Sequence, residues 1–534
     1  MMLPQQQFTR AILAFFAHVA VSASCIIAKE PGAGHWSEFR NGGTSSAHGE
    51  LPAKWSSENV AWQHELIGYG QSTPTIHGGL VFVTCVEGSM KDECVVSCFE
   101  LKSGREIWVY RAPATVKGTS NYMSSRAAPT PVVDSRGVYA FFESGDCLAI
   151  DHAGKQLWGR SLTSDYGKFD NNHGLGASPT QTETSVVINV EHKGPSYLIA
   201  LDKGSGKTAW KTDRSSSSSW SSPIVMNIDG KQQIIVSSGG TVDGYDAASG
   251  KSTWSIGGLD GNSVPSPTAS GKMLYVGARV PEFGEDGEAA KSNLCIALND
   301  KSSNDANPSV AWRASKAISD YASPVVCGDC VYYLNKIGVL YCLSMSTGHQ
   351  HYVERLGTQC WATPIVAGDR IYFFGKDGKT QIVRAGPKFE LIHSNRLWES
   401  DNAPKPVSYV ENNAIHGHGA QTESGGSGGV GNAGPRGRGG PGGGMLATLM
   451  KADLDSNGTL SAEEIPADFK PMLARIDTNR DGSLDQAEIK AMAEGFAARR
   501  ADSRDGARDP IVYGAAAVDG AIVIRTGTRL YCVQ

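Results

Sequence analysis

The stretch LDKGSGKTAW, residues 201–210, recurs in altered form along the chain and decides the fold. Related copies are LKSGREIW at 101–108, IDHAGKQLW at 150–158 and YDAASGKSTW at 245–254, and a more divergent copy closes at Trp312. Each of the four quoted copies ends in a tryptophan shortly after a glycine and a lysine or arginine. Repetition with a period of about 40–57 residues is typical of propellers and solenoids.

A second short motif marks where each repeat begins, namely a small or hydroxyl residue followed by proline and then a predicted strand. The starts are STPT (72–75), APTP (128–131), SPT (178–180), SPI (222–224), SPT (266–268), SPV (323–325), TPI (363–365) and a degenerate GAAA (514–517). The intervals each have room for about four short strands, as a propeller blade requires. The sequence therefore predicts a mainly β protein, an eight-bladed β-propeller of four-stranded blades.

The two ends of the chain are predicted to share one blade. The last repeat stops after its third strand, at 529–533, and lacks an outer strand. Near the N-terminus, 59–66 (NVAWQHEL) has strand character and places Trp62 where the other blades place their terminal tryptophan. Pairing of these segments would close the ring and remove an exposed sheet edge.

Composition divides the chain further. Blades one to seven, with the N-terminal closing strand, are expected at 36–400, and the last blade at 510–534. A glycine-rich linker is predicted at 401–444, because its stretch from 417 to 444 has no side chains that could form a core. Between linker and last blade, 445–499 is predicted to be a small α-helical EF-hand insertion.

Two twelve-residue windows in this insertion match the EF-hand calcium loop, DLDSNGTLSAEE (453–464) and DTNRDGSLDQAE (477–488). Calcium takes six to eight oxygen ligands, supplied by loop positions 1, 3, 5, 7, 9 and 12, with glycine at position 6. The predicted ligands are Asp453, Asp455, Asn457, Thr459, Ser461 and Glu464 in the first loop, and Asp477, Asn479, Asp481, Ser483, Asp485 and Glu488 in the second.

Other positions of the two loops agree with this assignment. Gly458 and Gly482 occupy position 6, and Leu460 and Leu484 occupy position 8, where paired loops form a short shared β-bridge. Two calcium ions are therefore expected. An acidic surface turn is the simpler alternative, and a dockerin-like module resembles the close spacing, but dockerins lack the apolar entering helix predicted here at 445–450.

Length, charge and the N-terminal segment limit which partners and which cellular location we expect. With 534 residues, 63 glycines and a net charge of -5, the chain gives no reason to expect a nucleic-acid partner. Residues 1–28 contain the apolar run AILAFFAHVAVS at 11–22 and are predicted to be a signal peptide. We expect a soluble monomer exported to the periplasm or cell envelope. A lipid anchor at Cys25 is the alternative, and no membrane-spanning segment is expected in the mature chain.

Three sets of residues carry a family resemblance: HWSEFRNGG at 35–43, LPAKWSSENVAWQ at 51–63, and the repeated glycine and tryptophan motifs. With these the chain resembles the bacterial PQQ-binding-like β-propeller repeat proteins, over about 36–400 and 510–534. That family includes quinoprotein alcohol dehydrogenases and the BamB-like scaffold of outer-membrane protein assembly. Quinoprotein dehydrogenases typically show an adjacent Cys-Cys pair over the cofactor; this chain has none, so PQQ is not expected.

Candidate ligand-binding residues lie three positions before each start proline, near the predicted mouth of the central channel. The set is Gln71, Arg126, Gly176, Trp220, Val264, Tyr321, Trp361 and Tyr513. Arg126 and the four aromatic residues could stack a planar ligand or hold a peptide. The alternative is that they only fill the channel. His173 is expected to be a hydrogen-bonded loop residue, and no catalytic constellation is predicted.

The cysteines are expected to be packing residues. Cys98, Cys342 and Cys532 align with Ala149, Ala200 and Gly244 in a column of small buried side chains. Cys327 and Cys330 resemble a redox or zinc pair, but the same turn recurs at 367–370 without cysteine, which favours a hairpin turn.

Taken together, these patterns predict an exported calcium-binding propeller that serves as a non-catalytic scaffold for a protein or another ligand on a propeller face. The alternative is a quinoprotein-like, PQQ-dependent oxidoreductase that uses the channel mouth.

Overall fold

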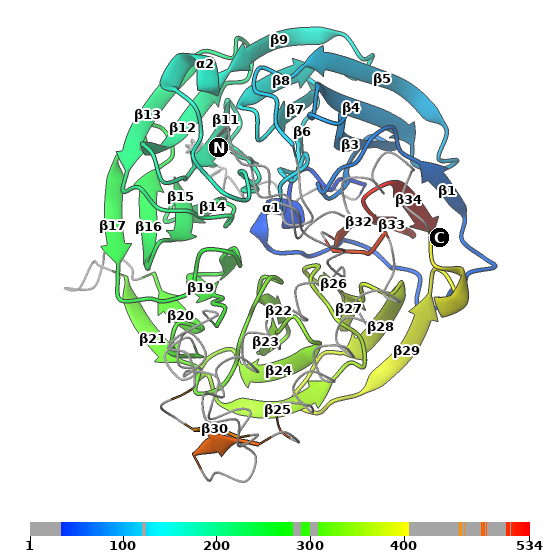
Figure 1. Ribbon diagram of the computed structural model, residues 1–534, viewed down its shortest axis with the longest axis vertical. Coiled ribbons are helices and arrows are strands. Elements are labelled where there is room, and N and C mark those ends of the chain that lie inside the picture. Colours follow the sequence, from blue (N-terminus) through cyan, green and yellow to red (C-terminus); the bar gives the residue numbers. More distant parts are fainter. Residues whose placement is uncertain are drawn as a thin grey trace, which may run out of the picture.

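The computed structural model describes residues 34–119, 124–280, 290–298, 308–404, 459–461, 464, 482–485, 488, 509–512 and 514–534. In these residues eight four-stranded antiparallel sheets are arranged as blades around a central axis (Figure 1). The predicted eight-bladed propeller is confirmed. The predicted signal peptide and most of the linker lie outside the described residues.

The first four blades follow the chain order, from the innermost strand outward. Blade 1 contains β2 (Thr75–His77), β3 (Leu80–Glu87), β4 (Glu93–Glu100) and β5 (Glu106–Pro113). Blade 2 contains β6 (Val132–Val133), β7 (Val138–Phe141), β8 (Asp146–Ile150) and β9 (Gln156–Ser161), followed by the short helix α2 (Leu162–Tyr166). Blade 3 contains β10 (Thr180–Gln181), β11 (Ser185–Val190), β12 (Ser196–Asp202) and β13 (Thr208–Arg214). Blade 4 contains β14 (Ile224–Ile228), β15 (Lys231–Ser238), β16 (Thr241–Asp246) and β17 (Ser252–Ile256).

The remaining blades complete the circle. Blade 5 contains β18 (Thr268–Ser270), β19 (Met273–Val276), β20 (Leu294–Ala297) and β21 (Ser309–Arg313). Blade 6 contains β22 (Val325–Cys327), β23 (Cys330–Leu334), β24 (Val339–Ser344) and β25 (Gln350–Arg355). Blade 7 contains β26 (Ile365–Ala367), β27 (Arg370–Phe374), β28 (Lys379–Arg384) and β29 (Leu391–Arg396), followed by the 3-10 turn η1 (Ser400–Asn402). Blade 8 contains β32 (Gly514–Val518), β33 (Ala521–Arg525) and β34 (Arg529–Val533), and its outer strand is β1 (Trp62–Glu65).

Position within a blade explains the sequence pattern of each strand. Inner strands such as β7 and β11 are buried at every residue, because neighbouring blades cover both faces of the sheet. The outer strands β5, β13 and β17 have many exposed residues, with partly buried ones between them. The sequence accordingly changes from runs of valine and isoleucine to mixed polar stretches within each repeat.

Outer-strand tryptophans of blades 1, 2, 3 and 5 lock their blade to the next, whereas Trp254 of blade 4 donates to Gln233 of its own blade. The Nε1 of Trp108 donates to the carbonyl of His152, 2.9 Å away, in the next blade. Trp158, Trp210 and Trp312 make the same contact with the carbonyls of Lys203, Ala247 and Met345. The ring of each tryptophan covers the repeat glycine; at Gly206, with φ +70°, an added Cβ would lie 2.7 Å from the Trp158 ring. This packing is why the glycine and the tryptophan recur together.

The cysteines behave as predicted. Cys327 and Cys330 face each other across the tight hairpin turn between β22 and β23. All ten cysteines that the structure describes are buried free thiols, and Cys98, Cys342 and Cys532 are fully buried. Burial raises the pKa of Cys98 to about 12, so this thiol stays protonated at neutral pH.

Within the described residues, no helix is long and apolar enough to cross a membrane.

Candidate functional site

One end of the central channel is closed by an N-terminal segment, here called the base segment, residues 34–51. Its short turn α1 (Arg40–Gly43) lies in the middle of the ring (Figure 1). Trp36 forms an antiparallel bridge with Ile76 of blade 1, and Ser46 forms a parallel bridge with Val366 of blade 7. The base segment thus links blade 1 to blade 7, the two blades on either side of blade 8.

Two buried ionisable side chains, Arg40 and Glu38, anchor this segment. The guanidinium of Arg40 donates to the carbonyls of Pro267 at 2.9 Å and Gly43 at 2.8 Å, and to the hydroxyl of Thr268. Burial lowers the pKa of Arg40 to about 9. On the other side, Glu38 Oε2 accepts a hydrogen bond from the hydroxyl of Thr180, 3.0 Å away. The base segment is therefore fixed through polar contacts to blades 3 and 5, and the channel is a blind pocket.

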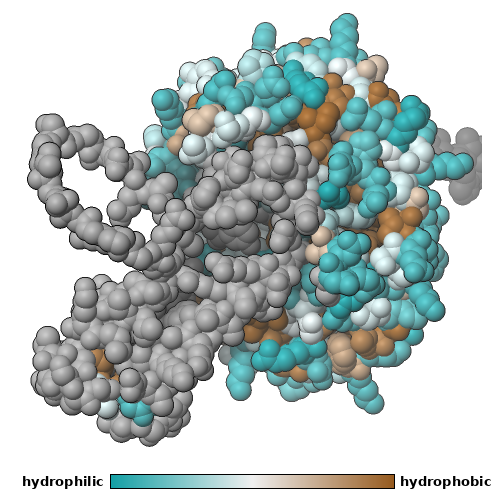
Figure 2. Space-filling view, turned by 45° about the vertical axis from the view of Figure 1, so that its right-hand side comes forward, coloured by the Kyte–Doolittle hydropathy of each residue, from teal (hydrophilic) through white to brown (hydrophobic). Residues whose placement is uncertain are grey.

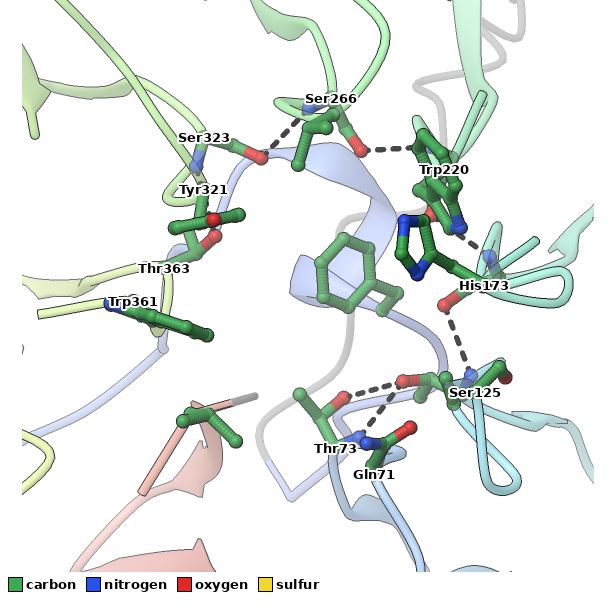
Figure 3. A pocket seen from close by; sticks show the side chains of 18 of the residues that line it. Gln71, Thr73, Ser125, His173, Trp220, Ser266, Tyr321, Ser323, Trp361 and Thr363 are labelled. Atoms are coloured by element: carbon green, nitrogen blue, oxygen red, sulfur yellow. Dashed lines mark hydrogen bonds between the residues drawn. The ribbon is translucent and has the colours of Figure 1, made fainter. Parts of the chain in front are cut away.

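A chain of hydrogen bonds between blades surrounds the axis above the base segment. In each bond the backbone N–H of a start residue donates to the side-chain hydroxyl of the start residue in the next blade, over 2.9–3.1 Å. The chain runs through Thr73, Thr130, Ser178, Ser222, Ser266, Ser323 and Thr363 (Figure 3). We call these seven residues the hydroxyl belt.

The belt is open at blade 8. Here Gly514, which offers no hydroxyl, lies next to Thr73 and Thr363, since a Cβ added to it would be within ordinary contact distance of both. The belt explains why serine or threonine precedes proline at the start of each of the first seven repeats. The sequence shows the residues plainly, but not that their hydroxyls bridge blades.

A cavity of about 650 Å³ opens from the belt toward the other face of the propeller (Figure 3). Phe39 of the base segment lines it, together with the belt, and its other walls come from loops of most blades. Pockets for small ligands commonly have this size. The aromatic residues of the predicted site line an open cavity, so they do not simply fill the channel.

The cavity brings together most of the predicted ligand-binding residues. Its walls include Gln71, Gly176, Trp220, Val264, Tyr321 and Trp361. Tyr321 and Trp361 stack on each other, with ring centroids 4.4 Å apart. The ammonium of Lys376 lies 3.9 Å from the Trp361 ring centroid, and burial lowers the pKa of Lys376 to about 8.

Arg126 and Tyr513 differ from the others. The guanidinium of Arg126 lies 3.7 Å from the ring centroid of Tyr69, a wall residue, so Arg126 supports the wall from behind. Its backbone N–H donates to Gln71 Oε1 at 2.8 Å, which orients the Gln71 amide. Tyr513 lies outside the described residues.

One corner of the cavity contains polar atoms without a protein partner, which the sequence did not predict. Ser125 is only 5 % exposed, yet its Oγ makes no hydrogen bond with the described residues. Nδ1 of His173 is likewise buried and without a partner, and the carbonyl of His173 accepts from the N–H of Ser125 at 2.6 Å. The His173 ring lies 5.8 Å from that of Trp220 (Figure 3). Buried polar atoms normally have partners, so this corner points to a ligand or to water.

The cavity does not fit PQQ. This planar quinone carries several carboxylates, and binding it would require several cationic side chains and oxygen ligands for a companion metal. Among the described lining residues, Arg279 and Asp260 are the only ones with formally charged side chains. The described residues also contain no cluster of three or more His, Cys, Asp or Glu side chains suited to a metal ion.

The EF-hand loops are described in part. Leu460 pairs with Leu484 through β30 (Leu460–Ser461) and β31 (Ser483–Leu484), and both leucines are buried. Gly482 has φ +85°, as position 6 of the loop requires. The predicted shared β-bridge is thus confirmed. Ligands Asp453, Asp455, Asn457, Asp477, Asn479 and Asp481 lie outside the described residues.

The carboxylates of the glutamates at loop position 12 accept hydrogen bonds from residues of their own loops. Glu464 Oε2 accepts from the backbone N–H of Ser461 at 3.0 Å and from its hydroxyl at 2.8 Å. Glu488 and Asp485 exchange hydrogen bonds in both directions, as in a capping box. Carboxylate and hydroxyl oxygens are the donors that calcium prefers, so the described part of both loops fits this ion.

Comparison with known proteins agrees with this architecture. Residues 46–172 and 168–266 match the family model of the outer membrane protein assembly factor BamB, and residues 469–493, which contain the second loop, match the EF-hand model. No curated protein sequence matches the chain.

Several solved structures align with the chain at low sequence identity. BamB from Moraxella catarrhalis is 15% identical with a TM-score of 0.44, covering 63% of this chain and 90% of that one. Quinohemoprotein alcohol dehydrogenase from Comamonas testosteroni is 13% identical with a TM-score of 0.39, covering 67% and 77%. A europium-containing methanol dehydrogenase is 12% identical with a TM-score of 0.39, covering 67% and 90%. These likenesses concern fold alone.

Proposed function

We propose that this chain, a BamB-like β-propeller repeat protein that carries an EF-hand segment, is an exported, non-catalytic binding scaffold. Its central cavity holds a ligand or part of a partner protein, and its inserted loops bind two calcium ions. The observation that carries the proposal is the blind cavity, whose wall combines aromatic side chains with buried polar atoms that have no protein partner.

The outer rim offers a weaker case for binding. Its exposed large hydrophobic side chains lie singly on different outer strands: Ile107 on β5, Leu157 on β9, Val353 on β25 and Leu391 on β29. Figure 2 shows hydrophobic areas on the described surface separated by hydrophilic ones. Isolated apolar residues are normal on soluble proteins, so the cavity is the better candidate for recognition.

Ligand-observed NMR with a library of small neutral fragments tests the cavity. Fragments that bind the wild type should lose their signal with Trp220→Ala and keep it with Leu157→Ala, a truncation on the exposed rim. If no fragment binds, or if Trp220→Ala binds as well as the wild type, the cavity is not the binding site.

Calorimetry tests the calcium sites. Wild-type protein should bind two calcium ions per chain, and the double variant Glu464→Gln/Glu488→Gln should bind none with comparable affinity. The match of the EF-hand model to 469–493 and the paired loops support this expectation. Each glutamate supplies a bidentate ligand in such loops, so its loss weakens binding most. Equal binding by both proteins would contradict the site assignment.

Export and assembly state are part of the same proposal. The signal-like segment at 1–28 supports export to the periplasm or envelope, and fractionation of the native host's cells tests it. Light scattering of the purified protein should give the mass of one chain, because no partner copy is needed to complete the ring.

A further inference from the structure

The shape of the cavity limits what enters it. The base segment closes one end, with Phe39 facing the cavity and Arg40 bonded beneath it. A volume of about 650 Å³ accommodates one or two six-membered rings with their substituents. A blind chamber of this size accepts the end of a molecule, and a polymer cannot pass through it.

Charge limits the ligand further. Asp260 is exposed and Arg279 is partly exposed, and the two have opposite charges. No other described lining residue has a formally charged side chain. Two cations, Lys376 and Arg126, lie against the wall residues Trp361 and Tyr69, but neither is itself a lining residue. An ionised group taken into the chamber would lose its hydration without pairing directly with a buried counter-charge, which is costly. A neutral ligand avoids this cost.

The polar atoms of the wall are suited to hydroxyl groups. Ser125 Oγ has no partner, so it can both donate and accept a hydrogen bond. Nδ1 of His173 donates or accepts according to its tautomer. A ligand hydroxyl, which itself both donates and accepts, satisfies either atom. A purely aromatic ligand would leave these buried atoms unsatisfied, at a cost of about 1–3 kcal/mol each.

Aromatic rings supply the remaining contact surface. Trp220 lies on one side of the cavity, beside His173, while Tyr321 and Trp361 lie on the opposite side (Figure 3). Aromatic side chains offer large apolar surfaces whose ring faces carry partial negative charge. The C–H face of a sugar ring is apolar with partial positive charge, and it complements such a surface while its edge remains rich in hydroxyls.

We propose that the central cavity binds the terminal ring of a neutral carbohydrate, with the C–H face against Trp220 or the Tyr321–Trp361 pair and hydroxyls at Ser125 and His173. This inference rests on the proposed function, since it names the ligand class of the same cavity. It follows from the combination of neutrality, unpartnered polar atoms and aromatic walls in one closed chamber.

A titration series with matched sugars tests the inference. The probes are glucose, galactose, N-acetylglucosamine, cellobiose and maltose as neutral ligands, and glucuronic acid and glucosamine as charged counterparts. Saturation-transfer NMR and tryptophan fluorescence report binding. At least one neutral sugar should bind saturably, and its charged counterpart should bind about tenfold more weakly or worse.

Two variants separate recognition from folding. Ser125→Ala removes an Oγ without a protein partner, so the melting temperature should stay unchanged while affinity for the neutral sugar falls. Trp220→Ala should abolish binding, and Leu157→Ala should leave it intact. A sugar affinity unaffected by both cavity variants would overturn the inference.

The outcomes also distinguish the two levels of the proposal. If fragments bind in a Trp220-dependent manner but no neutral sugar does, the carbohydrate inference fails and the binding cavity stands. If a peptide binds there in place of sugars, the ligand class is wrong. If neither fragments nor sugars bind, both proposals fail.

Discussion

Trp62 pairs directly with Cys532 across the strands β1 and β34, so the two ends of the chain complete a single blade. The indole of Trp62 also donates to the carbonyl of Leu101 in blade 1, 2.8 Å away, and covers Gly104. The same residue thus closes blade 8 and docks it onto blade 1. Closure of the ring depends on one contact of the kind that joins the other blades.

Substitution of Trp62 should accordingly weaken the whole propeller. Trp62→Ala removes a large buried side chain and is expected to lower the free energy of unfolding by about 3–5 kcal/mol. Trp62→Phe keeps most of the packing but leaves the Leu101 carbonyl without its donor, for an expected loss of about 1–2 kcal/mol. Urea unfolding followed by circular dichroism measures both. Equal stability of wild type and Trp62→Ala would show that the Trp62 side chain is not needed to close the ring.

The hydroxyl belt gives a second prediction. Ser266→Ala leaves the buried N–H of Ser222 without its acceptor, and we expect a loss of about 1–3 kcal/mol. Ser135→Ala, at an exposed turn, serves as the matched control and should change stability by less than about 0.5 kcal/mol. If both variants unfold at the same urea concentration, the belt contributes little to stability.

The repeat pattern was sufficient to predict the blades, because glycine and tryptophan are fixed by direct packing that recurs at most blade boundaries. It also predicted Trp220, Tyr321 and Trp361 in the cavity wall, since one offset from the start proline leads to the same place in each blade. The positions followed from periodicity alone.

Other parts of the site could not be predicted in this way. Phe39 lines the cavity because the base segment crosses the channel. The base segment is not part of a repeat, so the repeat pattern does not predict its course. Ser125 is distinctive only because its hydroxyl lacks a partner, a property of the folded packing. The side chain of Arg126 stacks on the ring of Tyr69 and is not directed toward the axis, although its position in the repeat corresponds to that of the lining residues.

Glu38 should make stability depend on pH. Burial raises the pKa of Glu38 from 4.5 to about 7, while the Thr180 hydrogen bond and the charge of Lys203 oppose this rise. The folded state therefore favours the protonated carboxyl. The contribution of Glu38 to the free energy of unfolding is fully present below pH 4.5. As the pH rises through 7 this contribution is lost, by about 3 kcal/mol in all.

Glu38→Gln isolates this effect, because a glutamine stays neutral and still accepts from Thr180. The melting temperature of Glu38→Gln relative to wild type should increase from pH 5 to pH 8. Glu58→Gln, which changes an exposed carboxylate, should show no such trend. A pH-independent difference for Glu38→Gln would contradict the assigned titration.

Asp509 anchors the chain where it returns from the EF-hand segment to blade 8. Its Oδ2 accepts from the hydroxyls of Thr526 and Thr528, at 2.6 and 2.5 Å, and the residue is fully buried. The next residues, Pro510 and Val512, line the cavity. The anchor therefore fixes both the return of the insertion and part of the cavity wall.

Asp509→Ala should consequently affect stability and binding together. Loss of the charge-assisted hydrogen bonds leaves two buried hydroxyls without their acceptor, and we expect a decrease of about 2–4 kcal/mol in the free energy of unfolding. Because the wall at 510–512 loses its support, the neutral fragments that bind wild type should bind more weakly. Asp329→Ala, an exposed change in the β22–β23 turn, provides the control. Weaker stability with unchanged fragment binding would show that the anchor supports blade 8 and not the cavity wall.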